Sequence, residues 1–196
     1  RGYIALEVFF KSSTVLGVAA AVLFGVGLIA KERENGTLEL LLTRPHSRTR
    51  ILLGKTFIAG LLVCIPILLN ALAVAPLGHW LVGETIAIGP LLLAAGHAIT
   101  FALAVLAVTV LCSVLCQTQT QAAFSIGALV VFQLSIYFVK GIRDISVFRM
   151  VDFDVYGALF GDTLPAGDLV TGYTIWLVLA TGVLLGTANR LFARRP

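Results

Sequence analysis

Residues 85–139 read TIAIGPLLLAAGHAITFALAVLAVTVLCSVLCQTQTQAAFSIGALVVFQLSIYFV and contain no Asp, Glu, Lys or Arg. A bilayer core about 30 Å thick is crossed by roughly 20 apolar residues in a helix, so a stretch of this length accommodates two spans. A polar turn from Gln117 to Gln121 divides it. The apolar residues run continuously and do not alternate with polar ones, which excludes the strands of a membrane β-barrel. We therefore expect two transmembrane helices joined by a short turn.

Three further uncharged runs flank this stretch, at 12–30, 56–83 and 169–189. Of the 196 residues, 59% are hydrophobic and 12% are charged, whereas soluble domains contain roughly 45–50% apolar and 25% charged residues. This composition excludes a water-soluble globule. The sequence predicts an all-α, polytopic helical membrane protein that forms a single transmembrane domain over 1–196, with five spans at about 12–30, 51–77, 90–115, 120–139 and 169–190.

The charges of the connecting segments orient these spans, because Lys and Arg concentrate on the cytoplasmic side of membrane proteins. Residues 31–55 carry six basic and three acidic side chains, and residues 190–196 carry three basic ones. Residues 140–168 carry three basic and five acidic side chains. We therefore expect 31–55 and the C-terminus on the cytoplasmic side and 140–168 on the outer side.

The cytoplasmic segment has the pattern of a helix, a turn and a second, short helix. Alternating charges at 31–34 extend the first span into water, and Asn35-Gly36 breaks that helix. A Leu-rich helix follows over 38–43, Pro45 ends it, and Ser47 can cap the next span. A solvated connector does not need four leucines, so a partner protein or the bilayer surface must cover some of them. The segment is either a docking element or a connector that lies on the membrane surface.

Uncharged polar side chains occur inside the predicted spans. Burying them in lipid is costly, so they should face the interior of the bundle or a watery path. Substrate contact along a translocation path and hydrogen bonding between helices both account for them. The residues are Asn70, His97, Thr100 and Gln133.

Small residues recur every four positions in two spans. Gly17, Ala21 and Gly25 do so in the first span, and Gly182 and Gly186 in the last. This spacing allows helix backbones to approach closely, either within one bundle or across a dimer interface. Chance is the alternative in a chain with 19 glycines.

The outer segment 145–166 interleaves aromatic and aliphatic residues with acids, so it is too polar to span and too apolar to float freely. A re-entrant or interface-lying helical element satisfies both requirements. Phe148, Phe153 and Phe160 could then lie at the interface as an outer gate over the path. Passive anchoring is the alternative role.

Catalytic and metal-binding patterns fail in this sequence. Gly54-Lys55-Thr56 resembles the end of a phosphate-binding loop, but Thr49 occupies the position that requires glycine. Neither GxSxG nor HExxH occurs. Three cysteines form no CxxC pair and fit packing roles. We expect no catalytic residue, no metal site and no enzyme activity in this chain.

The cytoplasmic segment also resembles a known family. The run Glu32-x-Glu34-x-Gly36-Thr37-Leu38-Glu39-x-Leu41-Leu42-Thr43-x-Pro45-x-Ser47-Arg48, closing with Gly54-Lys55, is similar to the signature of ABC-2 type ABC transporter permeases, the membrane subunits of bacterial export systems. The resemblance implies a coupling helix at about 35–45 that docks on a separate ATPase. The implied docking residues are Glu32, Glu34, Gly36, Thr37, Leu38, Glu39, Leu41, Leu42 and Pro45.

The resemblance also implies the partners and the location of the protein. The expected partners are an ABC ATPase subunit, a second permease subunit and membrane lipid, without nucleic acid. ATP and Mg²⁺ belong to the ATPase, so this chain needs no cofactor of its own. The expected location is the bacterial inner membrane. Family members usually have six spans, so a further span is expected before 12–30. The alternative function is a membrane-embedded structural or assembly protein that recruits another cytoplasmic partner.

Overall fold

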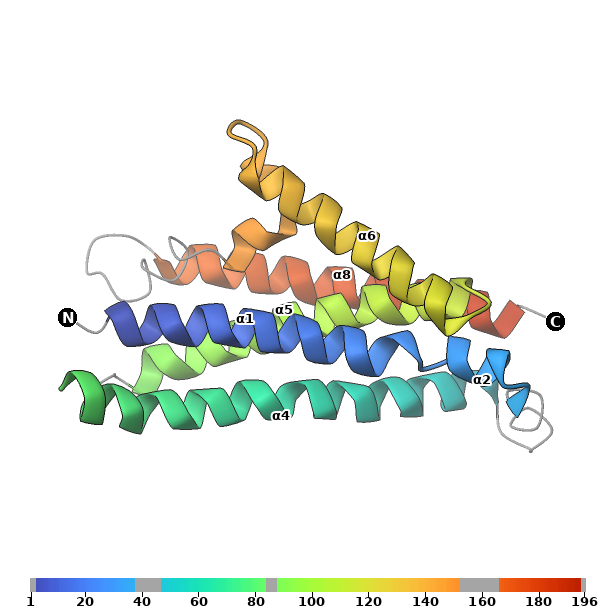
Figure 1. Cartoon of the computed structure of the whole chain (residues 1–196), viewed down its shortest axis with the longest axis horizontal. Coiled ribbons are helices and arrows are strands. Elements are labelled where there is room, and N and C mark those ends of the chain that lie inside the picture. Colours follow the sequence, from blue (N-terminus) through green and yellow to red (C-terminus); the bar gives the residue numbers. More distant parts are fainter. Residues whose placement is uncertain (1–2, 38–46, 84–87, 152–165, 195–196) are drawn as a thin grey trace.

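The computed structural model describes residues 3–37, 47–83, 88–151 and 166–194. All regular structure in these ranges is helical, and five helices are long and apolar enough to cross a membrane. Figure 1 shows that α6 leans away from the other long helices, which lie side by side. The elements are α1 (Tyr3–Val26), α2 (Ala30–Glu34), α4 (Arg48–Val82), α5 (Ile88–Leu115), α6 (Gln119–Phe138), the 3₁₀ turns η1 (Arg143–Ile145) and η2 (Val147–Val151), and α8 (Ala166–Arg194).

The five predicted spans are confirmed. The span predicted at 51–77 differs from the helix in the structure at both ends, and capping residues explain both differences. The span predicted at 51–77 is longer, because Ser47 caps α4 by accepting a hydrogen bond from the Arg50 N–H. Gly83, in the left-handed conformation with φ of 69°, ends the same helix. The span predicted at 12–30 is interrupted, since α1 ends at Val26 and α2 begins at Ala30.

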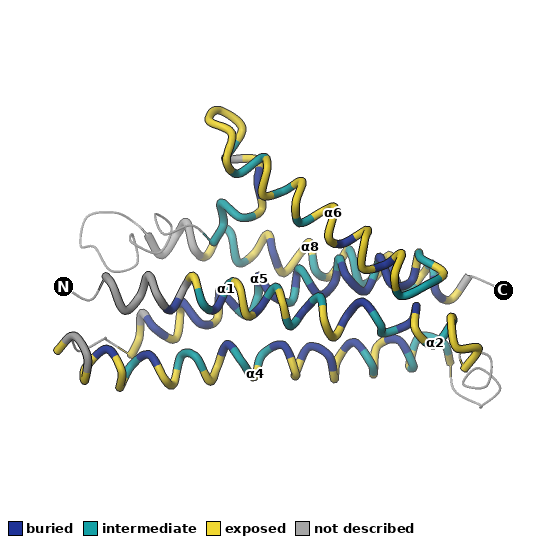
Figure 2. The backbone as a smooth tube through the Cα atoms, in the orientation of Figure 1, coloured by how far each residue is buried: buried dark blue, intermediate teal, exposed yellow. Residues whose placement is uncertain are grey.

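Helix α5 forms the centre of the bundle and packs against α1, α4 and α8. In its apolar span 61% of the residues are buried, against 11% in α6 (Figure 2). Small residues on α1 make the contact with α5 close: a Cβ atom at Gly17 would lie 3.0 Å from the Ala102 Cβ, and one at Gly25 would lie 2.8 Å from the Thr109 Cγ2. The packing role predicted for the small residues of the first span is thus confirmed within the bundle.

The glycines of the last predicted span are arranged differently. A Cβ atom at Gly182 or Gly186 would meet no other atom within 4 Å, and both residues are exposed. Their spacing therefore has no packing role among the described residues. A role in contact with another subunit stays a prediction.

The long helices alternate in direction, which brings distant segments together at two ends of the bundle (Figure 1). One end, here called the α2 end, contains α2, the start of α4, the turn between α5 and α6, and the end of α8. Its core includes Ile29, Leu52, Val114 and Phe192. The opposite end has a separate core that includes Phe9, Val74 and Leu91. The two basic segments of the sequence therefore meet at the α2 end, as their charges predict.

The predicted outer segment begins with short 3₁₀ turns. After α6 the chain forms η1 and η2 and returns toward α5 and α8, where Phe148 packs against Phe101 with ring centroids 6.0 Å apart. The remainder of the predicted segment, including Phe153 and Phe160, lies outside the described residues, so a re-entrant element stays a prediction.

Candidate functional site

The α2 end contains a dense network of hydrogen bonds around the break between α1 and α2. Ser113 of α5, which is fully buried, lies in this break. Its Oγ accepts from the Ile29 N–H at 3.1 Å and from the Ala30 N–H at 3.0 Å, and it donates to the Val26 carbonyl at 2.9 Å. In an unbroken helix, the Ala30 N–H would bond directly to the Val26 carbonyl. The serine hydroxyl therefore stands in the hydrogen-bond ladder of the helix, which is a known cause of kinks.

Two charged side chains of α2 bind the turn between α5 and α6. The Arg33 guanidinium donates to the carbonyls of Val114, at 3.2 Å, and Cys116, at the C-terminal end of α5. The Glu34 carboxylate accepts from the backbone N–H of Gln119, 2.9 Å away, at the N-terminal end of α6. Each charge also has the sign that the helix dipole favours at that end. The helix α2 and the α5–α6 turn are thus clamped to each other.

Glu32 connects α2 to α4. Its carboxylate forms an ion pair with Lys55, and both side chains are about three-quarters buried. The Glu32 carbonyl accepts a hydrogen bond from the Thr37 hydroxyl at 3.2 Å, and Gly36 adopts a left-handed φ of 69°. Asn35-Gly36 therefore ends the helix, as predicted. We call α2, residues 35–37 and their partners on α4, α5 and α6 the elbow.

The structure brings together only part of the predicted docking set. Glu32 and Glu34 point into the elbow and hold it, while Gly36 and Thr37 are exposed where the chain leaves it. The rest of the set lies outside the described residues: Leu38, Glu39, Leu41, Leu42 and Pro45. Sequence reasoning missed Arg33 and Ser113. The only signal for Arg33 was its place among the charges at 31–34, and a lone serine in an apolar span gave none.

The polar residues predicted for a translocation path lie at separate helix contacts. The Asn70 amide of α4 donates to the hydroxyls of Ser12 and Ser13 on α1, at 2.7 and 2.8 Å. Thr100 donates to the Gly96 carbonyl of its own helix. Neither Asn70 nor Thr100 lines the cavity of about 460 Å³ that lies between α4, α5 and α8. These contacts support helix packing, and a path role for the residues stays a prediction.

His97 and Gln133 both hold the chain that follows α6. The Nε2 of His97, which is 1% exposed, donates to the Met150 carbonyl of η2 at 2.9 Å. Its Nδ1 accepts from the Thr174 hydroxyl of α8 at the same distance. The Gln133 side-chain oxygen accepts from the Val147 N–H at 3.1 Å. The η2 turn is thereby connected to α5, α6 and α8 together.

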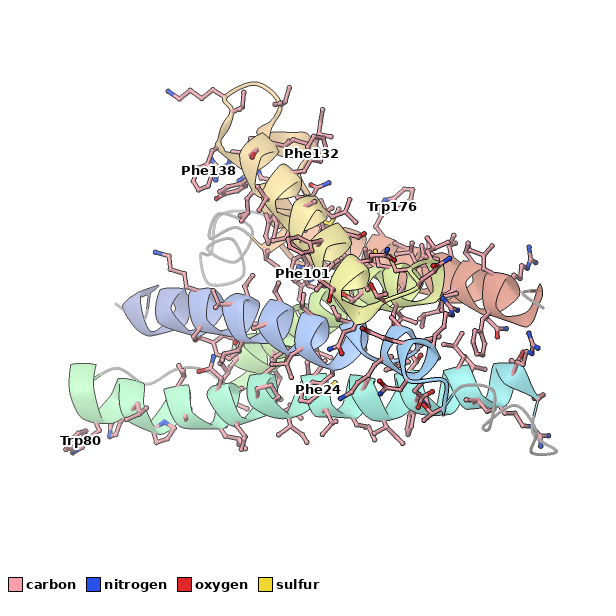
Figure 3. All side chains as sticks on the ribbon, turned by 45° about the vertical axis from the view of Figure 1, so that its right-hand side comes forward. Phe24, Trp80, Phe101, Phe132, Phe138 and Trp176 are labelled. Atoms are coloured by element: carbon pink, nitrogen blue, oxygen red, sulfur yellow. The ribbon has the colours of Figure 1, made fainter. Side chains whose placement is uncertain are left out.

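The part of α6 beyond its first two turns is largely exposed among the described residues. Phe132 and Phe138 are 60% and 78% exposed and point away from the other helices in Figure 3. Trp80 is 81% exposed at the end of α4 that lies opposite the α2 end. An aromatic residue at the end of a span is typical of a membrane–water boundary. Lipid or another subunit must cover the apolar surface of α6.

These features define a polytopic α-helical membrane protein whose first described span is followed by a short helix, α2, that binds α4, α5 and the start of α6. Residues 4–143 match the family described as ABC-2 family transporter protein, and the chain belongs to this family. Members of this family are membrane components of ABC transporters and lack an ATPase domain of their own. Membership therefore generally implies a separate ATPase partner. A comparison with curated proteins finds no match.

Proposed function

We propose that this chain is the permease subunit of an ATP-driven exporter and that the elbow presents a docking segment to a separate ATPase subunit. The observation that carries the proposal is the elbow of an ABC-2 family member: a short helix held by α4, α5 and α6 immediately before the Leu-rich residues 38–43. In this proposal the α2 end faces the cytoplasm of a bacterial inner membrane, which agrees with the basic charge of both segments that meet there.

The contacts of the elbow divide the predicted docking residues into two groups. Glu32 and Glu34 are engaged by Lys55 and Gln119 within the chain, so they position the docking segment and do not themselves contact the ATPase. The partner surface is formed by residues 36–45, whose leucines need an apolar cover. ATP and Mg²⁺ are held by the ATPase, where binding of ATP pulls on the docking segments of two permease subunits.

The second permease subunit is proposed to cover α6. This helix is the least buried span, and its outer half exposes Phe132 and Phe138. A path between two subunits would then run along α6, below the outer segment that His97 and Gln133 hold. Phe148 and the chain after it form the outer gate in this proposal, with Phe153 and Phe160.

Purification of the tagged permease from its native membrane tests this function. We expect a subunit that azido-ATP photolabels to co-purify, and the complex to hydrolyse ATP. Leu41→Asp places a charge against an apolar partner surface, at a cost of several kcal/mol if the charge is unpaired. It should abolish co-purification, whereas His79→Asp, at an exposed position near the end of α4 that lies opposite the α2 end, should not. Co-purification of a partner that binds no ATP would favour the alternative, a membrane protein that recruits another cytoplasmic protein.

A further inference from the structure

The break between α1 and α2 depends on a single side chain from another helix. Ser113 lies 83 and 84 positions away from the two N–H groups that it accepts from, and it satisfies three backbone groups at once. Gly27 lies within the break, between Val26 and the first residue of α2. A glycine weakens the helix there, but no proline is present to forbid it.

The same polar groups can be satisfied without the break. If Ser113 withdraws, the Ala30 N–H can bond to the Val26 carbonyl and the Ile29 N–H to the Gly25 carbonyl, which now accepts from the Leu28 N–H. The Ser113 hydroxyl can then bond to a carbonyl of its own helix, as Thr109 does with the Val105 carbonyl. Neither arrangement leaves one of these backbone groups or the Ser113 hydroxyl without a partner, so the hydrogen bonds of the break do not by themselves favour one arrangement.

We propose that the elbow is a two-state hinge, and that its state depends on whether the Ser113 hydroxyl is inserted in the break between α1 and α2. With Ser113 inserted, α1 and α2 are separate helices, as in this structure. With Ser113 withdrawn, they form one continuous helix and α2 changes direction. Because Glu34 holds the N-terminal end of α6, this change moves α6 as well. The hinge rests on the proposed function only for its driving force, which is a pull by the ATPase on the docking segment.

The packing of α6 allows it to respond to the hinge. Its buried contacts with the rest of the chain lie near its first two turns, where Ala122 and Ile126 pack against Val26 and Ala30 on both sides of the break. Figure 1 shows that α6 leans away from the other helices beyond this point. A small rotation of its first turns therefore displaces its far end, where Gln133 holds η2.

Distances between spin labels test the hinge in the full-length permease in nanodiscs. One label pair, Lys31→Cys with Arg190→Cys, joins α2 to α8; the other, Lys140→Cys with His79→Cys, joins the far end of α6 to α4. The four positions are exposed, and the native cysteines are replaced by alanine. In the wild type we expect the inserted state without nucleotide and a second distance in the ATPase complex with ATP and vanadate.

Ser113→Ala removes the inserted state, so the second distance should predominate without nucleotide in both label pairs. Gly27→Ala serves as an independent variant, because its methyl group fits at 3.5 Å from the Gln119 side chain and favours a continuous helix by about fivefold. It should move the populations in the same direction. Ser135→Ala is the matched control, since the Ser135 hydroxyl donates to the carbonyl of Val131 on the same helix and makes no hydrogen bond to another helix in the described part of the chain.

The hinge is refuted if Ser113→Ala and Gly27→Ala both keep the wild-type distances without nucleotide. If Ser113→Ala fails to fold, Gly27→Ala decides alone. The measurement without nucleotide needs no ATPase, so it can confirm or refute the hinge by itself. If no ATP-binding partner is found, the proposed function is refuted, but the hinge is not.

Discussion

Arg33 should contribute more to the stability of this protein than any basic residue that only meets solvent. Arg33→Gln removes the charged donor from the carbonyls of Val114 and Cys116 at the end of α5. A hydrogen bond to a charged group contributes about 1.5–3 kcal/mol net, and a cation at a helix C-terminus adds about 0.3–1 kcal/mol. Because water can reach part of this turn, we expect a total loss of about 2–4 kcal/mol.

Thermal unfolding of the purified permease in detergent, followed by circular dichroism, measures this loss. For a chain of 150–250 residues each kcal/mol lowers the Tm by about 2–4 °C, so Arg33→Gln should lower it by roughly 4–16 °C. Arg33→Lys keeps the charge but loses the planar fork, and should lie between the variant and the wild type. Arg190→Gln is the control, because Arg190 is exposed near the end of α8, which lies at the α2 end. Equal Tm values for Arg33→Gln and Arg190→Gln would show that the clamp contributes no stability.

Two other predictions concern packing and topology. Gly25→Ala places a methyl group 2.8 Å from the Thr109 Cγ2, so it should cost about 1–3 kcal/mol of stability. Gly96→Ala should cost nothing, because a Cβ atom there would have no atom within 4 Å. Equal stabilities of the two variants would contradict the close α1–α5 contact. A cysteine at Ser47 should react with an impermeant thiol reagent only from the cytoplasmic side and one at Lys140 only from outside, since Ser47 caps α4 at the α2 end and Lys140 follows the far end of α6. Labelling of both from one side would refute this arrangement.

The spans could be predicted from the sequence because they depend on local composition. An uncharged run such as 85–139 must form helices in a membrane, whatever its neighbours are. The balance of basic and acidic side chains in the connecting segments likewise predicted which segments meet at one end of the bundle. The cap at Ser47 and the break at Asn35-Gly36 follow from residues a few positions away, and both were predicted correctly.

The elbow could not be predicted because its contacts join residues far apart in the sequence. The run through Gly27 is apolar and continuous, so the sequence favours one unbroken span, and the cause of the break is Ser113 on another helix. The charges at 31–34 were interpreted as a helical turn in water. Two of them instead bind Lys55 and the Gln119 N–H, partners that only the packed bundle brings near.

The most direct test of the central claim is a photocrosslink from the docking segment. A photoreactive phenylalanine analogue replaces Leu41 in the tagged permease, and a second variant carries it at Val131 on the exposed face of α6. After irradiation of native membranes, we predict that the Leu41 variant alone forms a crosslinked product with a subunit that binds azido-ATP. Crosslinking of Leu41 only to lipid, or to a protein that does not bind ATP, would contradict the account of this segment as the site where the permease meets its ATPase.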